Sequence, residues 1–107
     1  MGTSIGMAVY GLRPVPEMQF DGFSIPALDQ LINHASRIRN RSRGRFRVPL
    51  TVRIPYSGGI RALEHHSESP ETYFVHTPGL TVVVPSHEPA PCPGPRLSRF
   101  RVCHRYC

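Results

Sequence analysis

Apolar positions at the start of the chain predict a helix followed by an extended segment. Residues 2–10 are small and mostly apolar and are followed by Gly11, which is typical of a helix closed by a glycine just past its end. Residues 13–20 contain Pro14 and Pro16, and these exclude a helix there. We therefore expect a short strand with an irregular start.

The clearest periodicity in the chain predicts an amphipathic helix over residues 24–38. Ser24 can act as its N-cap, and Pro26 fits its first turn. Because the apolar side chains recur at helical spacing, one face of this helix must be buried. The residues of that face are Leu28, Leu31, Ile32, Ala35 and Ile38.

The next segments predict a strand, a loop, a helix and a second strand. Residues 48–54 are rich in β-branched and aliphatic side chains, and residues 55–67 form a glycine-containing loop that can approach a ligand. Residues 69–79 begin with Ser-Pro-Glu, which predicts a helix start, and residues 80–84 are continuously apolar, as in a strand buried on both faces. This alternation predicts an α/β fold, a partial parallel sheet flanked by helices, over residues 1–86.

The pattern stops after Ser86. Residues 87–107 have no helical or strand period long enough to fold, and we expect a disordered, proline- and arginine-rich tail. The prolines of this tail are Pro89, Pro91, Pro93 and Pro95.

The charge of the chain comes from arginine alone. The net charge is +6, all 13 basic residues are arginine, and six of them occupy every second position from Arg37 to Arg47. Dense cations favour binding to phosphates by counterion release, so a small nucleic-acid-binding protein is one hypothesis. We favour a solvated helix end and loop, the usual role of such a run.

The sequence gives no sign of a membrane or secreted protein. No stretch reaches the roughly 20 apolar residues that a bilayer-crossing helix needs, and no basic segment precedes the apolar start. We expect a soluble cytoplasmic protein. Three cysteines in the last sixteen residues, Cys92, Cys103 and Cys107, form no disulfide framework, and with His104 they make only a weak zinc pattern. We therefore expect no metal site.

Two adjacent histidines are the strongest candidates for chemistry. His65 and His66 lie where the glycine loop meets the start of a helix, in the sequence EHHSESPE. Histidine suits proton transfer near neutral pH, although a paired histidine in a loop is more often a surface feature. Neighbouring serines do not make a serine hydrolase, because none has a strand-turn-helix nucleophile elbow around it.

Three segments, in order and in register, resemble one enzyme family. They are GLRPVPEMQFDGFSIPALDQLIN, VPLTVRIPYSGGI and HHSESPETYFVHTPGLTVVVPS. They are similar to the beta subunit of the thiamine-diphosphate-dependent first component of branched-chain 2-oxo acid and pyruvate dehydrogenase complexes. The resemblance implies that residues 1–86 are part of a pyrimidine-binding domain of the transketolase type. It also implies thiamine diphosphate as cofactor, with magnesium and the diphosphate held by an alpha subunit.

The same resemblance implies roles for particular residues. Phe23 matches the aromatic residue that packs against the aminopyrimidine, and His66 matches the active-site histidine, which faces the oxo acid and assists acyl transfer to a lipoyl group. His65 is then a neighbour that could support it. The implied partners are an alpha subunit, a second beta subunit and the lipoyl-bearing acyltransferase. The HSESPE segment favours a branched-chain substrate over pyruvate.

The sequence differs from the family at two places, and both differences predict a loss of activity. The glutamate that activates the cofactor would precede Met1, and Glu17 matches a different family position, so we expect a fragment that is inactive alone. The tail replaces the helix, strands and second domain that follow in the family, which suggests a shifted reading frame or a truncated gene. A truncated product without function is therefore a further alternative, beside the arginine-rich binding protein.

Overall fold

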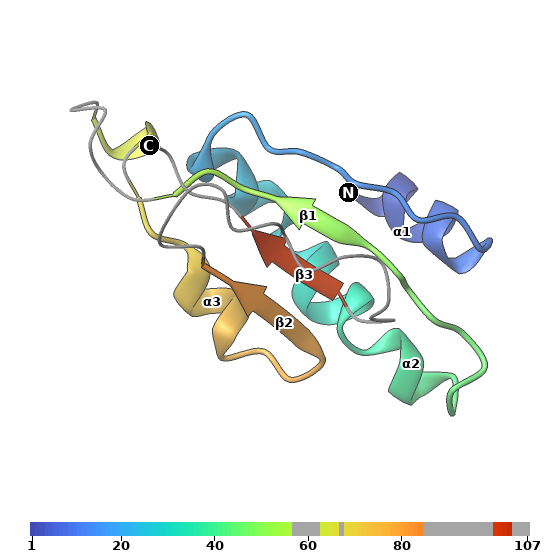
Figure 1. Ribbon diagram of the computed structural model, residues 1–107. Helices are drawn as coiled ribbons and strands as arrows, with labels where there is room; N and C mark the ends of the chain where they lie inside the picture. The colour runs from blue at the N-terminus through green and yellow to red at the C-terminus, as the bar shows by residue number, and fades with distance from the viewer. Residues whose placement is uncertain (57–62, 67, 85–99, 104–107) are drawn as a thin grey trace.

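The computed structural model describes residues 1–56, 63–66, 68–84 and 100–103 (Figure 1). Most of the expected glycine loop and most of the tail, with Cys92, His104 and Cys107, lie outside these residues. The helical segments are α1 (Gly2–Val9), η1 (Asp21–Ala27), η2 (Gln30–Ala35), α2 (Ile38–Arg41), η3 (Glu64–His66) and α3 (Glu71–Val75). The strands are β1 (Thr51–Arg53), β2 (Leu80–Val83) and β3 (Phe100–Cys103).

The three described strands form one parallel sheet. Their order is β1, β3, β2, so β3 lies between the other two, as Figure 1 shows. In the register, Val52 and Val82 both pair with Val102. Parallel strands require a crossover connection, and α3 lies in the crossover from β1 to β2. The predicted α/β class is confirmed, whereas the flanking of the sheet by helices stays a prediction.

The central strand β3 corrects the expectation for the tail. Residues 87–107 are predicted to be disordered, and for Phe100–Cys103 that prediction is wrong, since these four residues pair on both sides. A four-residue segment is too short for its own periodicity to predict a strand. Its backbone is ordered because two neighbouring strands supply partners for its N–H and C=O groups.

The short strand predicted over residues 13–20 is present only as an extended segment that bridges β1 at one residue. The N–H of Arg53 donates to the carbonyl of Pro16 at 3.0 Å, and the carbonyl of Arg53 accepts from the N–H of Met18 at 2.8 Å. The pairing amounts to one isolated bridge, between Glu17 and Arg53. Proline has no N–H to donate, so this segment cannot complete a ladder with β1.

The long helix predicted over residues 24–38 is present in a different form. The helical backbone begins three residues earlier, at Asp21, and passes through 3-10 and π segments before α2 ends. Ser24 is therefore not the N-cap, and its buried hydroxyl has no hydrogen-bond partner among the residues that the structure describes. The predicted inward face is correct, because Leu31 and Ala35 are buried.

Gly11 ends α1 as the sequence predicts. Its φ of 105° lies in the left-handed region, which glycine adopts without a Cβ penalty. The N–H of Gly11 donates to Ala8 and the N–H of Leu12 donates to Met7, at 3.1 and 3.0 Å. This pair of bonds is a Schellman motif and satisfies two carbonyls at the helix end.

One apolar cluster joins the helices to β1 and its flanks. Alternate residues from Val48 to Ile54 point into it, which agrees with the predicted strand even though only Thr51–Arg53 pairs as a strand. β2 is half-buried rather than fully buried, because it lies at the edge of the described sheet. Among the described residues, no helix has the length and apolar character needed to cross a bilayer. The cluster comprises Ile5, Ala8, Leu31, Ala35, Val48, Leu50, Val52, Ile54 and Phe74.

Candidate functional site

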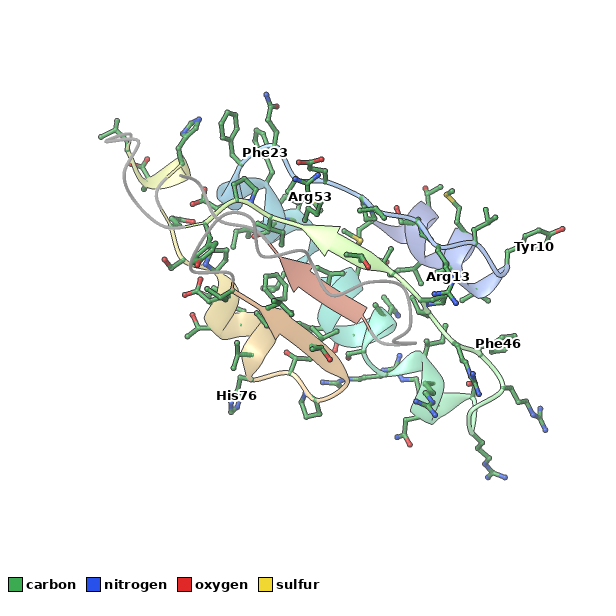
Figure 2. All side chains as sticks on the ribbon, viewed as in Figure 1. Tyr10, Arg13, Phe23, Phe46, Arg53 and His76 are labelled. Carbon is green, nitrogen blue, oxygen red and sulfur yellow. The ribbon has the colours of Figure 1, made fainter. Side chains whose placement is uncertain are left out.

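The predicted cofactor-binding residue Phe23 lies on an exposed turn of η1. The chain changes from extended backbone at Phe20 (φ −138°, ψ 157°) to helical backbone at Asp21. This change brings the Phe20 and Phe23 rings together, with centroids 5.7 Å apart and planes at 60°. Phe23 keeps 44% of its surface exposed, and Figure 2 shows its ring projecting outward from η1. Phe23 thus contacts Phe20 and is at the same time partly exposed to solvent.

The predicted catalytic residue His66 lies against the same aromatic pair. It ends the short segment η3, where its N–H donates to the carbonyl of Leu63 at 3.1 Å. Its imidazole meets the Phe20 ring edge-on, with centroids 4.1 Å apart. The structure thus brings His66 and Phe23 to one place through the ring of Phe20, although they lie far apart in the sequence.

A buried carboxylate ties the two segments together. Asp21 is only 1% exposed. Its Oδ1 accepts from the N–H of Gly22 at 2.8 Å, and its Oδ2 accepts from the N–H of Glu68 at 2.5 Å. The second bond links the start of η1 to the backbone just beyond His66.

Sequence reasoning missed both Phe20 and Asp21. Their proximity to Phe23 was visible in the sequence, and an acidic residue in the first turn of a helix is a recognised signal. Neither signal reveals that the partner of these residues is a loop much later in the chain. The side chain of His65 and the glycines of the loop lie outside the described structure.

An apolar pocket lies apart from this cluster, where β1 and β2 end. Glu71 lines this pocket, and one of its carboxylate oxygens is buried with no hydrogen-bond partner in the described part of the chain. Neither Phe23 nor His66 lines the pocket, so it is not the predicted site. Its lining residues are Ile54, Tyr56, Pro70, Glu71, Phe74, Val82, Val83 and Val84. In the part of the chain that the structure describes, no three His, Cys, Asp or Glu residues are grouped to hold a metal ion.

Comparison with known proteins decides the family. The family described as "Transketolase, pyrimidine binding domain" matches residues 1–90. The chain belongs to this family. Its relatives within the transketolase pyrimidine-binding family are beta subunits of 2-oxo acid dehydrogenases, as the resemblance implies.

Three relatives show how far the likeness extends. The beta subunit of the pyruvate dehydrogenase E1 component from Acholeplasma laidlawii is 57% identical over 86 residues, which are 80% of this chain and 26% of the relative. The beta subunit of 3-methyl-2-oxobutanoate dehydrogenase from Mycobacterium tuberculosis is 58% identical over 86 residues, 80% of this chain and 25% of the relative. The beta subunit of 2-oxoisovalerate dehydrogenase from Pseudomonas aeruginosa is 52% identical over 87 residues, 81% of this chain and 25% of the relative.

The chain thus spans about a quarter of the length of these relatives. The pyruvate and branched-chain enzymes match it at nearly the same identity, 57% and 58%. Identity therefore does not distinguish the two substrates, and the preference for a branched-chain oxo acid stays a prediction. The matched region also ends before β3, so the central strand of this sheet comes from outside the family segment.

Proposed function

We propose that residues 1–86 form the pyrimidine-side part of a 2-oxo acid dehydrogenase beta subunit, with Phe23 and His66 as its functional residues. The observation that carries the proposal is the ring of Phe20, which contacts both of them. The sequence resemblance implies a role for Phe23 and for His66 without relating their positions in space. Their meeting at one aromatic surface supports a common site.

The cofactor implied by the family is thiamine diphosphate, and the exposed ring of Phe23 fits its aminopyrimidine. Flat aromatic groups pack on one another in offset or edge-to-face geometry, and this buries apolar area on both. When bound, thiamine diphosphate supplies the carbanion that attacks the 2-oxo carbon and the electron sink that lets carbon dioxide leave. Phe23 would orient the pyrimidine half of the cofactor.

His66 would face the oxo acid beside that ring. Histidine can donate or accept a proton at a ring nitrogen near neutral pH, and this suits hydrogen bonding to the substrate carboxylate and transfer of the acyl group. The contact with Phe20 restricts the direction of the imidazole. In this proposal the alpha subunit binds the diphosphate and its magnesium. A second beta subunit and a lipoyl-bearing acyltransferase are the further partners.

A binding experiment with matched variants tests this proposal. The chain is mixed with the alpha subunit of a branched-chain 2-oxo acid dehydrogenase, magnesium and thiamine diphosphate, and cofactor retention is measured. We expect Phe23→Ala to weaken retention about tenfold or more, because a stacked ring and its buried area are lost. Phe46→Ala is the control, since Phe46 is 49% exposed and lies at the other end of the molecule in Figure 2. Equal retention by the two variants would reject the role of Phe23.

We expect the same mixture to release no carbon dioxide from 3-methyl-2-oxobutanoate or pyruvate. No residue of this sequence matches the glutamate that activates the cofactor in the family, so binding should occur without turnover. Turnover at ordinary enzyme rates would show that another acid of this chain replaces that glutamate.

A further inference from the structure

The Asp21 carboxylate accepts two backbone hydrogen bonds, and only one of them belongs to the helix start where Asp21 lies. It is almost completely buried, and both oxygens accept backbone N–H groups, one from Gly22 and one from Glu68. The bond to Gly22 is local and belongs to the start of η1. The bond to Glu68 connects two segments that are distant in the sequence.

Burial makes these two bonds necessary. A carboxylate removed from water is costly unless its oxygens are hydrogen-bonded, and bonds to a charged acceptor are among the strongest in proteins. The ion pairs within the described part of the chain involve Asp29 and Glu17, not Asp21. The two amides therefore replace part of the solvation of this charge, and the geometry requires two acceptor oxygens.

Adjacent residues thus hold the histidine segment at two points. Phe20 contacts the imidazole of His66, and Asp21 binds the backbone N–H of Glu68, two residues further along. The first contact restricts the ring of His66, and the second restricts the backbone at Glu68. The same turn continues directly to Phe23. One short segment of the chain therefore contacts both proposed functional residues or contains them.

We propose that Asp21 is a positioning residue that sets the orientation of the His66 imidazole through the backbone of Glu68. This inference rests on the proposed function for the role of His66 and deepens it by naming the group that orients this histidine. Asp21 itself stays inside the protein and does not reach the substrate. Its contribution is to keep the imidazole against Phe20 and toward the face that Phe23 presents.

Nuclear magnetic resonance on the full chain without cofactor tests the proposal. In wild type we expect the Glu68 amide to be protected from hydrogen exchange and the His66 ring protons to be displaced by the nearby Phe20 ring. Asp21→Ala should speed Glu68 exchange, relative to amides of β1, about tenfold or more, equivalent to about 1.4 kcal/mol. The His66 signals should move in the same variant.

Two further variants keep the test decisive. Asp21→Asn keeps the shape of the side chain and one acceptor oxygen, so its effects on Glu68 exchange and on the His66 signals should lie between those of wild type and Asp21→Ala. If Asp21→Ala does not fold, Asp21→Asn alone tests the role of Asp21. Asp29→Asn changes an exposed carboxylate whose partners are Asn33 and His34, and it should leave both Glu68 and the His66 signals unchanged.

Two results would overturn the inference. One is an unchanged Glu68 exchange rate in both Asp21 variants, which would remove the tether. The other is faster Glu68 exchange with unchanged His66 signals, which would reduce Asp21 to a backbone anchor. Failure of the proposed function would look different, because Phe23→Ala would then retain cofactor like its control while the Asp21 effects on His66 persisted.

Discussion

Gly79 offers a sharp test of how the segment after α3 packs against the rest of the molecule. It lies in the turn between α3 and β2, and its φ of 96° is in the left-handed region. A Cβ added there would overlap the carbonyl oxygen of Ser36 and lie 3.2 Å from the carbonyl carbon. Because the obstacle is backbone, a side-chain rotation cannot relieve it.

The expected cost of Gly79→Ala has two parts. The left-handed conformation costs a residue with a Cβ about 1–2 kcal/mol. Forcing an extra carbon into a packed site costs about 1–3 kcal/mol more. The sum is about 2–5 kcal/mol, a large share of the roughly 5–15 kcal/mol that stabilises a typical domain.

Gly44→Ala is the matched control. Its φ of 81° is also left-handed, but among the described residues beyond its two chain neighbours no atom lies within 4 Å of an added Cβ. Gly44→Ala should therefore cost only the conformational part, about 1–2 kcal/mol. Urea unfolding followed by circular dichroism gives both values from the midpoint and slope. If Gly79→Ala were no more destabilising than Gly44→Ala, the close approach of this turn to Ser36 would be wrong.

Two further predictions follow from burial and charge. Leu31→Ala should lower the free energy of unfolding by about 2–5 kcal/mol, because Leu31 is 0% exposed in the core, whereas Leu12→Ala, at a half-exposed position, should change it by less than about 0.5 kcal/mol. Similar losses in urea unfolding would contradict the assigned core. The alternating arginines from Arg37 to Arg47 are exposed, so retention on heparin should fall steeply with added salt. Retention that survives high salt would contradict binding by simple charge attraction to these arginines.

Local patterns were enough for several parts of this protein. The glycine that ends α1, the inward face carrying Leu31 and Ala35, and the alternation through β1 all follow from neighbouring residues. Such features are predictable because helical and strand periods relate each residue to neighbours at fixed spacing. The family was likewise predictable, because three separate segments resemble it in order and in register.

Other features depended on contacts between distant segments. The four residues of β3 carry too little pattern to predict a strand, and β1 and β2 together order their backbone. Ser24 had the right residue type for an N-cap, yet the helical backbone begins at Asp21. Local sequence preference could not predict a helix start at Asp21, because the Asp21 side chain also binds the backbone of Glu68, far along the chain.

The sequence by itself determined the α/β class, the positions of most elements and the candidates Phe23 and His66. Only the tertiary structure decided that Phe20 contacts both of these residues and that Asp21 ties their segments together. The physical reason is that periodicity records which face of an element avoids water, whereas the partner of a buried group depends on where the chain returns in space.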